Sequence, residues 1–393
     1  MKKSTRFLSV LCVVAMLSLL FVSCGKESGG DSGYAANNTE FIIGFSGPLT
    51  GSAAIYGTAV ANAAQMAVDE INAAGGIDGT KFKVVALDDK NDASNIATNF
   101  ANLYEGGMQV SLGTVTTAPG LEFKTYAHED NVFVLTPSAS NDDIPEFDNG
   151  YQMCFADGNQ GTVAAEYVNS ICAGKTIGIF YKSDDAYSMG IYDKFKATLD
   201  DSITVVETSF NDATSTDFSV QINNLKDCPF IFMPIYYQPA TLFMTQAADV
   251  MAKDTVYYGC DGFDGIESMT GFDISSIPQE VSMLSHFNSK ATDGKAAEFI
   301  KKYTDKYGKD TLNQFGASAY DCVYAIYDAM LEAYNNDNNS IKVTMSASDL
   351  CDLLKAKFNS GYEFSGVTGD KITWDSNGYV NKSAIKYVIK EHD

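Results

Sequence analysis

The segment from residue 41 to residue 79 constrains the fold more than any other part of the chain. It reads FIIGFSGPLTGSAAIYGTAVANAAQMAVDEINAAGGIDG. The apolar run 41–45 predicts a strand, and a turn rich in glycine and serine leads into a helix over about 58–73, which ends at Gly75-Gly76. No GxGxxG phosphate loop follows the strand. In open α/β folds small polar ligands bind beside such turns, so we expect a ligand site here.

The rest of the chain repeats this alternation of strand and helix. Strands that alternate with helices of this length predict parallel sheets with right-handed crossovers. The pattern runs twice, before and after about Asp157, which predicts an α/β fold with two Rossmann-like lobes. The expected strands are 81–87, 110–112, 132–135, 151–155, 176–181, 203–208, 230–236, 255–259, 281–287 and 383–389. The expected helices are 93–104, 118–129, 160–172, 187–199, 217–225, 239–251, 293–307, 316–334 and 347–358.

The first residues have the features of an export signal. Three basic residues within positions 2–6 precede an uncharged apolar run at 7–22, which is short for a membrane span. The stretch Leu20-Phe21-Val22-Ser23-Cys24 resembles a bacterial lipobox, in which the cysteine is acylated. The sequence therefore predicts a lipoprotein signal peptide over residues 1–23. A small, polar, flexible tether that begins at the lipidated Cys24 is expected over 24–39.

The composition excludes several classes of function. The chain has 50 acidic against 27 basic residues and a formal net charge of −23, which repels nucleic acid and anionic lipid. A bound carboxylate would therefore be held by local dipoles and hydroxyl groups, because the long-range field opposes it. The hydrophobic fraction of 45% and the chain length favour two domains with substantial cores.

Motifs for metal binding or catalysis are missing from the sequence. The cysteines after residue 24 form no CxxC pair and no cluster with histidine. His128, His286 and His392 are too scattered for a metal or general-base site, and no GxSxG elbow is present. We therefore expect no metal, no cofactor and no enzymatic activity.

Three pieces of the opening segment carry a family resemblance. GPLTG, then YG, then INAAGGIDG occur in order and resemble the start of the branched-chain amino-acid-binding proteins of ABC transporters. These are type I periplasmic solute-binding proteins, and the resemblance extends over about residues 40–390. It implies a hinge that the chain crosses three times. The implied N-terminal lobe is 40–157 plus 286–381, and the C-terminal lobe is 158–285 plus 382–393.

The resemblance also implies a function. It predicts an extracytoplasmic lipoprotein, anchored to the membrane only through Cys24, that binds a free amino acid between two closing lobes. A branched-chain amino acid is expected first and an aromatic one next, with ABC permease subunits as partners and a monomeric state. Two alternatives stay open: a sensing lipoprotein of the same fold that docks on a receptor, and a carrier of an amide or short organic acid.

A free amino acid needs donors for its carboxylate and acceptors for its ammonium, because neither ion is buried without partners. Thr116 and Thr117 follow the third predicted strand and could grip the carboxylate; the sequence does not decide between them. Ser138 and Ser140 follow the fourth strand, where the resemblance implies a carbonyl for the ammonium and a hydroxyl, respectively. Hydroxyls at such places also cap helices and turns.

The resemblance assigns the ammonium to an acidic residue of the second lobe. Asp261 follows the strand at 255–259 and matches that position. Asp264 is the near rival, and Asp157, at the first hinge crossing, is a further candidate. The alternative for each is a solvated surface carboxylate.

Tyrosines at strand ends are the predicted walls of the site. Tyr56 lies in the YG pair, Tyr187 matches the family's Y-G-x-G segment, and Tyr237 lies close to its Y-x-P segment. Tyr320, in an A-Y-D segment, is expected on the first-lobe side of the pocket. Each ring combines an apolar face with one hydroxyl. With 22 tyrosines in the chain, a purely structural role is the alternative for each.

Overall fold

The computed structural model describes residues 33–392. The predicted signal peptide, the lipidation site Cys24 and the first part of the tether lie outside these residues. The end of the predicted tether is packed on the first lobe. Tyr34–Asn37 form a 3-10 helix, Ala35 is buried, and the Asn38 side chain donates a 2.8 Å hydrogen bond to the Gly107 carbonyl.

Five parallel strands form the sheet of the first lobe, in the order β2-β1-β3-β4-β5. Alternate residues of β1 serve opposite faces, as the pleat requires. Ile43 and Phe45 join the core beneath α1 and α9, whereas Ile42 packs with the side chains of α2 and α3. The strands are β1 (Phe41–Gly47), β2 (Phe82–Asp88), β3 (Val110–Ser111), β4 (Phe133–Thr136) and β5 (Gly150–Gln152).

Six strands form the sheet of the second lobe, in the order β11-β10-β9-β8-β6-β7. All pairs are parallel except β10 with β11, which are antiparallel because β11 enters from the opposite direction at the end of the chain. The strands are β6 (Thr176–Lys182), β7 (Thr204–Phe210), β8 (Phe230–Met233), β9 (Val256–Gly259), β10 (Glu280–Ser285) and β11 (Ile385–Lys390).

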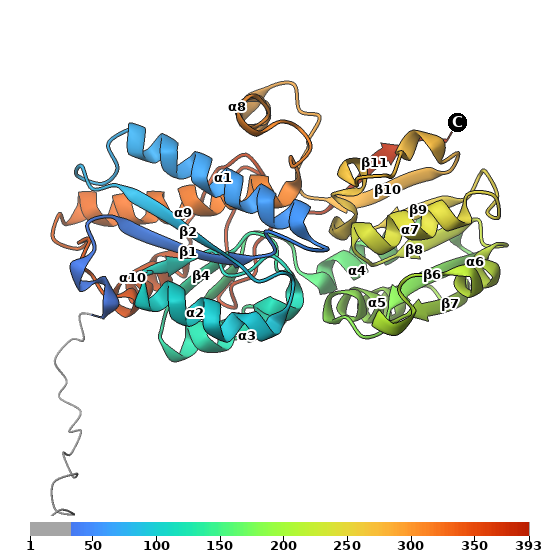
Figure 1. Ribbon diagram of the computed structural model, residues 1–393, viewed down its shortest axis with the longest axis horizontal. Helices are drawn as coiled ribbons and strands as arrows, with labels where there is room; N and C mark the ends of the chain where they lie inside the picture. The colour runs from blue at the N-terminus through green and yellow to red at the C-terminus, as the bar shows by residue number, and fades with distance from the viewer. Residues whose placement is uncertain (1–32, 393) are drawn as a thin grey trace, which may run out of the picture. The chain divides into compact units, whose positions relative to one another are not determined.

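Helices cover both faces of each sheet. Figure 1 shows α1 and α9 on one face of the first sheet and α2 and α3 on the other. The first lobe carries α1 (Ala54–Ala73), α2 (Ile96–Glu105), α3 (Thr117–Glu129), α8 (Gly294–Tyr307), α9 (Gln314–Asn336) and α10 (Ala347–Phe358). The second carries α4 (Asp157–Cys172), α5 (Ala186–Thr198), α6 (Ser219–Leu225) and α7 (Tyr237–Ala247).

The chain passes between the lobes three times: between β5 and α4, between β10 and α8, and before β11. The predicted α/β architecture with two parallel-dominated sheets is therefore confirmed, with β11 as the antiparallel exception. The residue boundaries predicted for the lobes stay a prediction.

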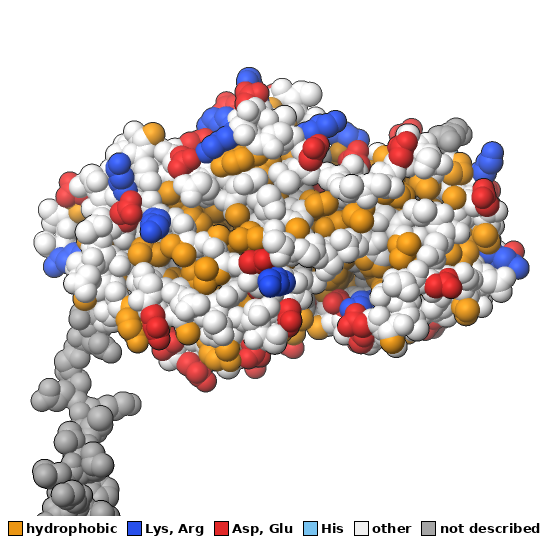
Figure 2. All heavy atoms as spheres, viewed as in Figure 1, with side chains coloured by type: hydrophobic (Ala, Val, Ile, Leu, Met, Phe, Trp, Pro, Cys, Tyr) orange, Lys and Arg blue, Asp and Glu red, His pale blue; other side chains and the backbone are white. Residues whose placement is uncertain are grey.

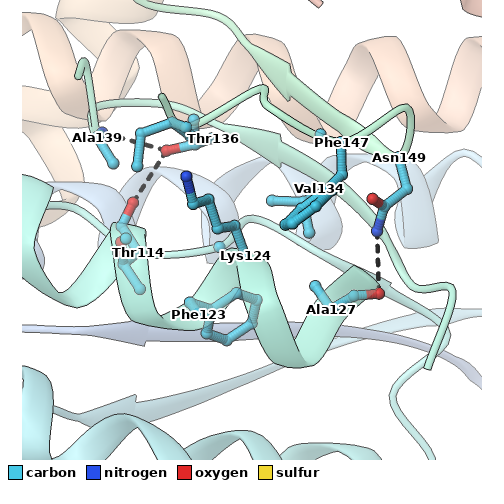
Figure 3. Close-up of a pocket in the computed structure, with 13 residues that line it drawn as sticks. Thr114, Phe123, Lys124, Ala127, Val134, Thr136, Ala139, Phe147 and Asn149 are labelled. Atoms are coloured by element: carbon cyan, nitrogen blue, oxygen red, sulfur yellow. Dashed lines mark hydrogen bonds between the residues drawn. The ribbon is translucent and has the colours of Figure 1, made fainter. Parts of the chain in front are cut away.

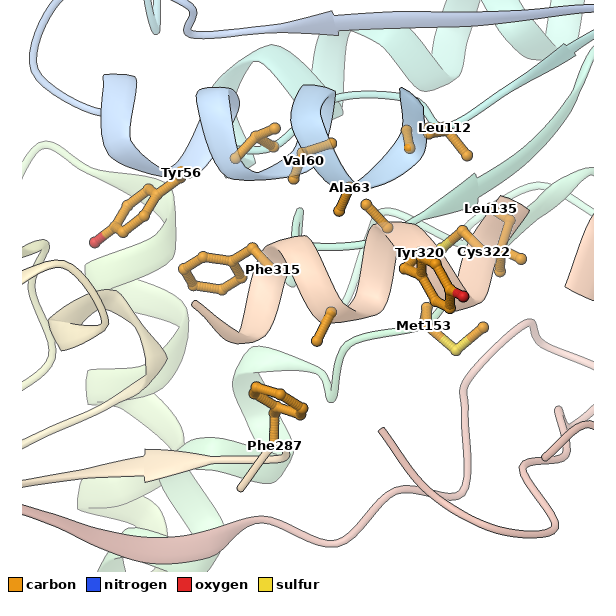
Figure 4. Close-up of a cluster of buried hydrophobic side chains, with 14 of the residues drawn as sticks. Tyr56, Val60, Ala63, Leu112, Leu135, Met153, Phe287, Phe315, Tyr320 and Cys322 are labelled. Carbon is orange, nitrogen blue, oxygen red and sulfur yellow. The ribbon is translucent and has the colours of Figure 1, made fainter. Parts of the chain in front are cut away.

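Helices α1 and α9 pack closely at the centre of the first lobe. Figure 4 shows Tyr56 and Phe315 projecting from the first turns of these two helices toward each other, and their ring centroids are 4.8 Å apart. Helix α1 begins at Ala54, four residues earlier than predicted. Within it, any Cβ at Gly57 would collide with the carbonyl oxygen of Pro48, so glycine lets the turn after β1 lie directly on the helix.

Charged side chains are spread over the surface. Figure 2 shows lysine and acidic side chains scattered over the face in view, with hydrophobic side chains between them. Within residues 33–392, no helix combines the length and the apolar character needed to cross a membrane.

Candidate ligand-binding site

A small cavity lies where strands of both sheets end. The atom-free space among its lining residues is about 220 Å³, part of it open to solvent, so the cavity is narrow in this closed arrangement. Each contributing segment follows the carboxyl end of a strand or begins a helix, as expected for an α/β ligand site. The lining residues are Tyr56, Val115, Thr117, Ser138, Ser140, Tyr187, Tyr236, Asp261, Gly262 and Phe315.

One wall of the cavity offers hydrogen-bond donors. Thr116 and Thr117 are the N-cap and first residue of α3, and both are buried. Neither hydroxyl has a hydrogen-bond partner, and the Thr116 side chain makes no cap. A buried hydroxyl without a partner is unfavourable, so these groups are suited to receive an acceptor, at the positive end of a helix. Thr117 lines the cavity, whereas Thr116 does not.

The loop after β4 supplies two more hydroxyls to the same wall. The Thr136 hydroxyl accepts from the backbone N–H of Ala139 at 3.1 Å, which holds the loop in place. Ser138 and Ser140 are buried and line the cavity. Both were predicted to contact the ligand, and that role stays a prediction. The carbonyl of Ser140 is already occupied, because it accepts the N–H of Asp157 at 2.7 Å.

The opposite wall carries Asp261, in a 3-10 turn directly after β9. The Tyr187 hydroxyl donates to Oδ1 at 2.6 Å, and the Asp261 N–H donates to Gln160 Oε1 at 3.0 Å. The Tyr187 bond holds the carboxylate in place, and the Gln160 side chain and the Gly262 N–H also stabilise its charged form. Burial raises the pKa of Asp261 to about 6, an effect that the Tyr187 bond opposes. At neutral pH the carboxylate is therefore mainly ionised, and none of its described hydrogen-bond partners is basic.

Asp157 lies behind this wall rather than in it. It is the first residue of α4, is fully buried, and does not line the cavity. Neither of its carboxylate oxygens has a hydrogen-bond partner. Burial, and then the charge of Asp261, raise the pKa of Asp157 well above its ordinary value. Asp157 therefore supports Asp261 from behind, and its place outside the cavity lining does not suit direct pairing with a ligand.

Aromatic rings close the cavity, but one of them differs from the prediction. The rings of Tyr187 and Tyr236 stack with centroids 4.6 Å apart, and Tyr236 lines the cavity. Tyr237 instead packs behind Tyr56, with centroids 5.0 Å apart, and donates its N–H to the Tyr56 hydroxyl at 3.4 Å. Tyr236 precedes α7 in an extended conformation while Tyr237 is its first helical residue, so the two side chains diverge.

Tyr320, the other predicted tyrosine outside the lining, lies away from this cavity. Its hydroxyl donates to Glu70 at 2.7 Å and its ring packs on Phe299, in a separate groove between α8 and α9. Figure 4 shows it farther along α9 than Phe315, which is the residue of this helix that lines the cavity. Sequence reasoning missed Phe315, although it directly precedes the predicted helix start at Gly316.

A second cavity, of about 340 Å³, lies beneath α3 and is shown in Figure 3. Its polar groups are paired within the protein. The Thr136 hydroxyl donates to the Thr114 carbonyl at 3.0 Å, and the Asn149 amide donates to the Ala127 carbonyl at 2.9 Å. With these polar groups satisfied, this cavity offers less to a polar ligand than the one between the sheets.

Known proteins identify the family. The sequence model described as "Periplasmic binding protein" matches residues 40–378. The chain belongs to this family. Solved structures agree, among them the branched-chain amino acid transporter substrate-binding protein LivJ of Streptococcus pneumoniae in complex with isoleucine. That structure has a TM-score of 0.76 and 27% identity, over 90% of this chain and 99% of LivJ. The leucine-binding protein LivK of Thermotoga maritima has the same fold, with a TM-score of 0.75 and 22% identity over 89% of this chain and 95% of LivK.

Curated relatives have names from the branched-chain group of this family. The Leu/Ile/Val-binding protein BraC3 of Rhizobium johnstonii is 31% identical over 235 residues, 58% of this chain and 64% of BraC3. The leucine-, isoleucine-, valine-, threonine- and alanine-binding protein of Pseudomonas aeruginosa is 27% identical over 68% of this chain and 69% of its own length. The chain thus spans somewhat less than two thirds of BraC3. The resemblance to branched-chain amino-acid-binding proteins is confirmed, and the family is one of extracytoplasmic solute-binding proteins.

Proposed function

We propose that the protein is the solute-binding component of an ABC importer and binds a free branched-chain amino acid. One observation carries this proposal: the unpartnered hydroxyl of Thr117 and the ionised carboxylate of Asp261 belong to the same cavity of about 220 Å³. A zwitterion matches this arrangement. Its carboxylate would accept from the Thr117 hydroxyl, and its ammonium would donate to Asp261 Oδ2. Ser138 and Ser140 complete the donor side.

The remaining walls favour an apolar side chain. Val115, Phe315, Tyr56 and Tyr236 surround the space between the two polar groups. The Tyr56 hydroxyl donates to the Gly262 carbonyl, so that it is satisfied within the protein and the ring presents its apolar face. These apolar walls suit the side chain of leucine, isoleucine or valine first, and an aromatic amino acid is the second choice because rings line the cavity. The names of the relatives point the same way.

The location and partners follow as part of the proposal. Acylation of Cys24 would hold the protein at the outer side of the cell membrane, and the amino acid would pass to ABC permease subunits. The lipobox-like residues 20–24 support the anchor, although they lie outside the described part of the chain. A monomer suffices, because all residues proposed to hold the ligand come from one chain.

Calorimetric titration of the exported, processed protein with a panel of free amino acids tests the proposal. We expect saturable binding of leucine, isoleucine or valine. Leucine methyl ester, which lacks the carboxylate, and 4-methylpentanoate, which is leucine without its ammonium, should bind far more weakly. Binding of 4-methylpentanoate or benzoate as tight as that of leucine would contradict the amino-acid assignment and favour a carrier of organic acids.

A further inference from the structure

The loop that carries Asp261 is attached to the first lobe at two points directly after this residue. The Tyr56 hydroxyl, from α1, donates to the carbonyl of Gly262. Asp264 Oδ2 accepts the backbone N–H of Gln314, the first residue of α9, at 2.8 Å. Tyr56 and Gln314 belong to the first lobe, whereas the loop at 261–264 follows β9 of the second. Both bonds therefore exist only when the lobes are together.

The bond from Asp264 completes the start of α9. The first N–H groups of a helix have no partner within the helix. Asn313 Oδ1 accepts two of them, from Phe315 at 3.1 Å and from Gly316 at 3.0 Å. Asn313 does not accept the N–H of Gln314. This N–H donates instead to Asp264 Oδ2 of the other lobe. An acidic side chain at this end of a helix also interacts favourably with the helix dipole.

We propose that Asp264 is a positioning residue that stabilises the closed arrangement and holds the Asp261 loop against the ligand, and that it is not a second partner of the ligand ammonium. The inference rests on the proposed amino-acid site. Asp264 does not line the cavity, whereas Asp261 does. Phe315, the next residue after Gln314, lines it. The bond between Asp264 and α9 thus lies directly behind two walls of the cavity, one from each lobe.

The two roles require different properties of Asp264. Pairing with an ammonium requires a negative charge, whereas the bond to Gln314 requires only an acceptor oxygen. Burial raises the pKa of Asp264 to about 7, an effect that the Gln314 bond opposes, so that a large fraction of the side chains is neutral at neutral pH. Asparagine keeps an acceptor oxygen at the same place and removes the charge.

Leucine binding by Asp264→Ala and Asp264→Asn distinguishes the roles. Asp254→Ala, a change at an exposed aspartate, is the matched control. We expect Asp264→Ala to raise Kd roughly 5-fold, the effect of one lost hydrogen bond, mainly through faster dissociation in stopped-flow traces. Asp264→Asn should stay within about 2-fold of the wild type, as should the control.

An unchanged Kd and dissociation rate in Asp264→Ala would overturn the proposal. Equal losses in Asp264→Ala and Asp264→Asn would also overturn it, because the charge would then matter and not the acceptor. If the wild type binds no amino acid, the proposed function is wrong, but the proposed role of Asp264 in lobe closure can still be tested. Small-angle scattering of the ligand-free proteins then tests whether the bond from Gln314 to Asp264 holds the lobes together. A larger radius of gyration for Asp264→Ala than for Asp264→Asn is expected, and equal radii would contradict it.

Discussion

At the scale of single residues, the site depends on which polar atoms the protein leaves without partners. The Tyr187 hydroxyl donates to Oδ1 of Asp261, and among the described residues the Thr117 hydroxyl has no hydrogen-bond partner. The sequence could point to these two positions because each follows the carboxyl end of a parallel strand, where α/β folds bind ligands. It could not separate Tyr236 from Tyr237, since a shift of one residue in the start of α7 decides which ring reaches the cavity.

Replacement of Asp261 should be the most damaging single change. Among the described residues that line the cavity, Asp261 is the one carboxylate, and the loss of this buried charged partner in Asp261→Ala amounts to about 3 kcal/mol or more, a Kd increase of roughly 100-fold. Tyr187→Phe removes one hydrogen bond to Asp261, so that an increase of roughly 5-fold is expected. Calorimetry with leucine measures both. Equal binding by Asp261→Ala and the wild type would remove the assignment.

The affinity should also depend on pH. Burial disfavours the charged form of Asp261 and raises its pKa to about 6 in the closed arrangement. A bound ammonium requires the ionised form, so the affinity is fully present above about pH 7 and declines as the pH falls through 6. Below that value the decline approaches tenfold per pH unit. Titrations between pH 5 and pH 8 should show this decline in the wild type and not in Asp261→Ala.

At the scale of helices and strands, the alternating pattern predicted most elements, while their ends were less certain. Strand β1 and helix α10 were predicted because apolar runs and helical periodicity are local properties. The cavity-facing residue of α9 was not predicted, because the sequence shows the buried face of a helix but not which end of it reaches the ligand. Phe315 lies at that end and Tyr320 lies farther along, bonded to Glu70.

Two substitutions in α9 should therefore differ in their effect on leucine affinity. Phe315→Ala removes a ring from the cavity and from its contact with Tyr56, and we expect leucine to bind roughly 10-fold more weakly. Tyr320→Phe removes only the bond to Glu70 and should leave Kd within about 2-fold of the wild-type value. Thermal melting of both variants controls for loss of folded protein. A larger effect on Kd from Tyr320→Phe than from Phe315→Ala would contradict this placement.

At the scale of the whole molecule, the proposed site combines groups from two lobes that are separated along the chain. Thr117 follows β3 of the first sheet and Asp261 follows β9 of the second, and the chain passes between the lobes three times. The family resemblance implied this topology. Local sequence patterns alone did not, because they do not show to which sheet a late segment such as β11 returns. Two-lobed folds of this kind close on their ligands by hinge motion, since the ligand binds the closed form more tightly.

Ligand binding should consequently stabilise the folded protein as a whole. At a leucine concentration 100 times Kd, the free energy of unfolding should rise by about 2.7 kcal/mol through mass action. Differential scanning calorimetry should show a melting temperature that increases with leucine concentration. The Asp261→Ala variant, with a Kd roughly 100-fold higher, should gain only about 0.4 kcal/mol at the same concentration, whereas Asp254→Ala should behave like the wild type. A melting temperature that is independent of leucine in the wild type would contradict leucine binding.

A crystal structure of the protein grown with leucine tests the central claim most directly. The proposed site predicts the leucine ammonium within hydrogen-bonding distance of Asp261 Oδ2, and its carboxylate on the hydroxyl of Thr117 and the Ser140 hydroxyl. An empty cavity at saturating leucine would contradict the account. So would a ligand bound with its carboxylate toward Asp261.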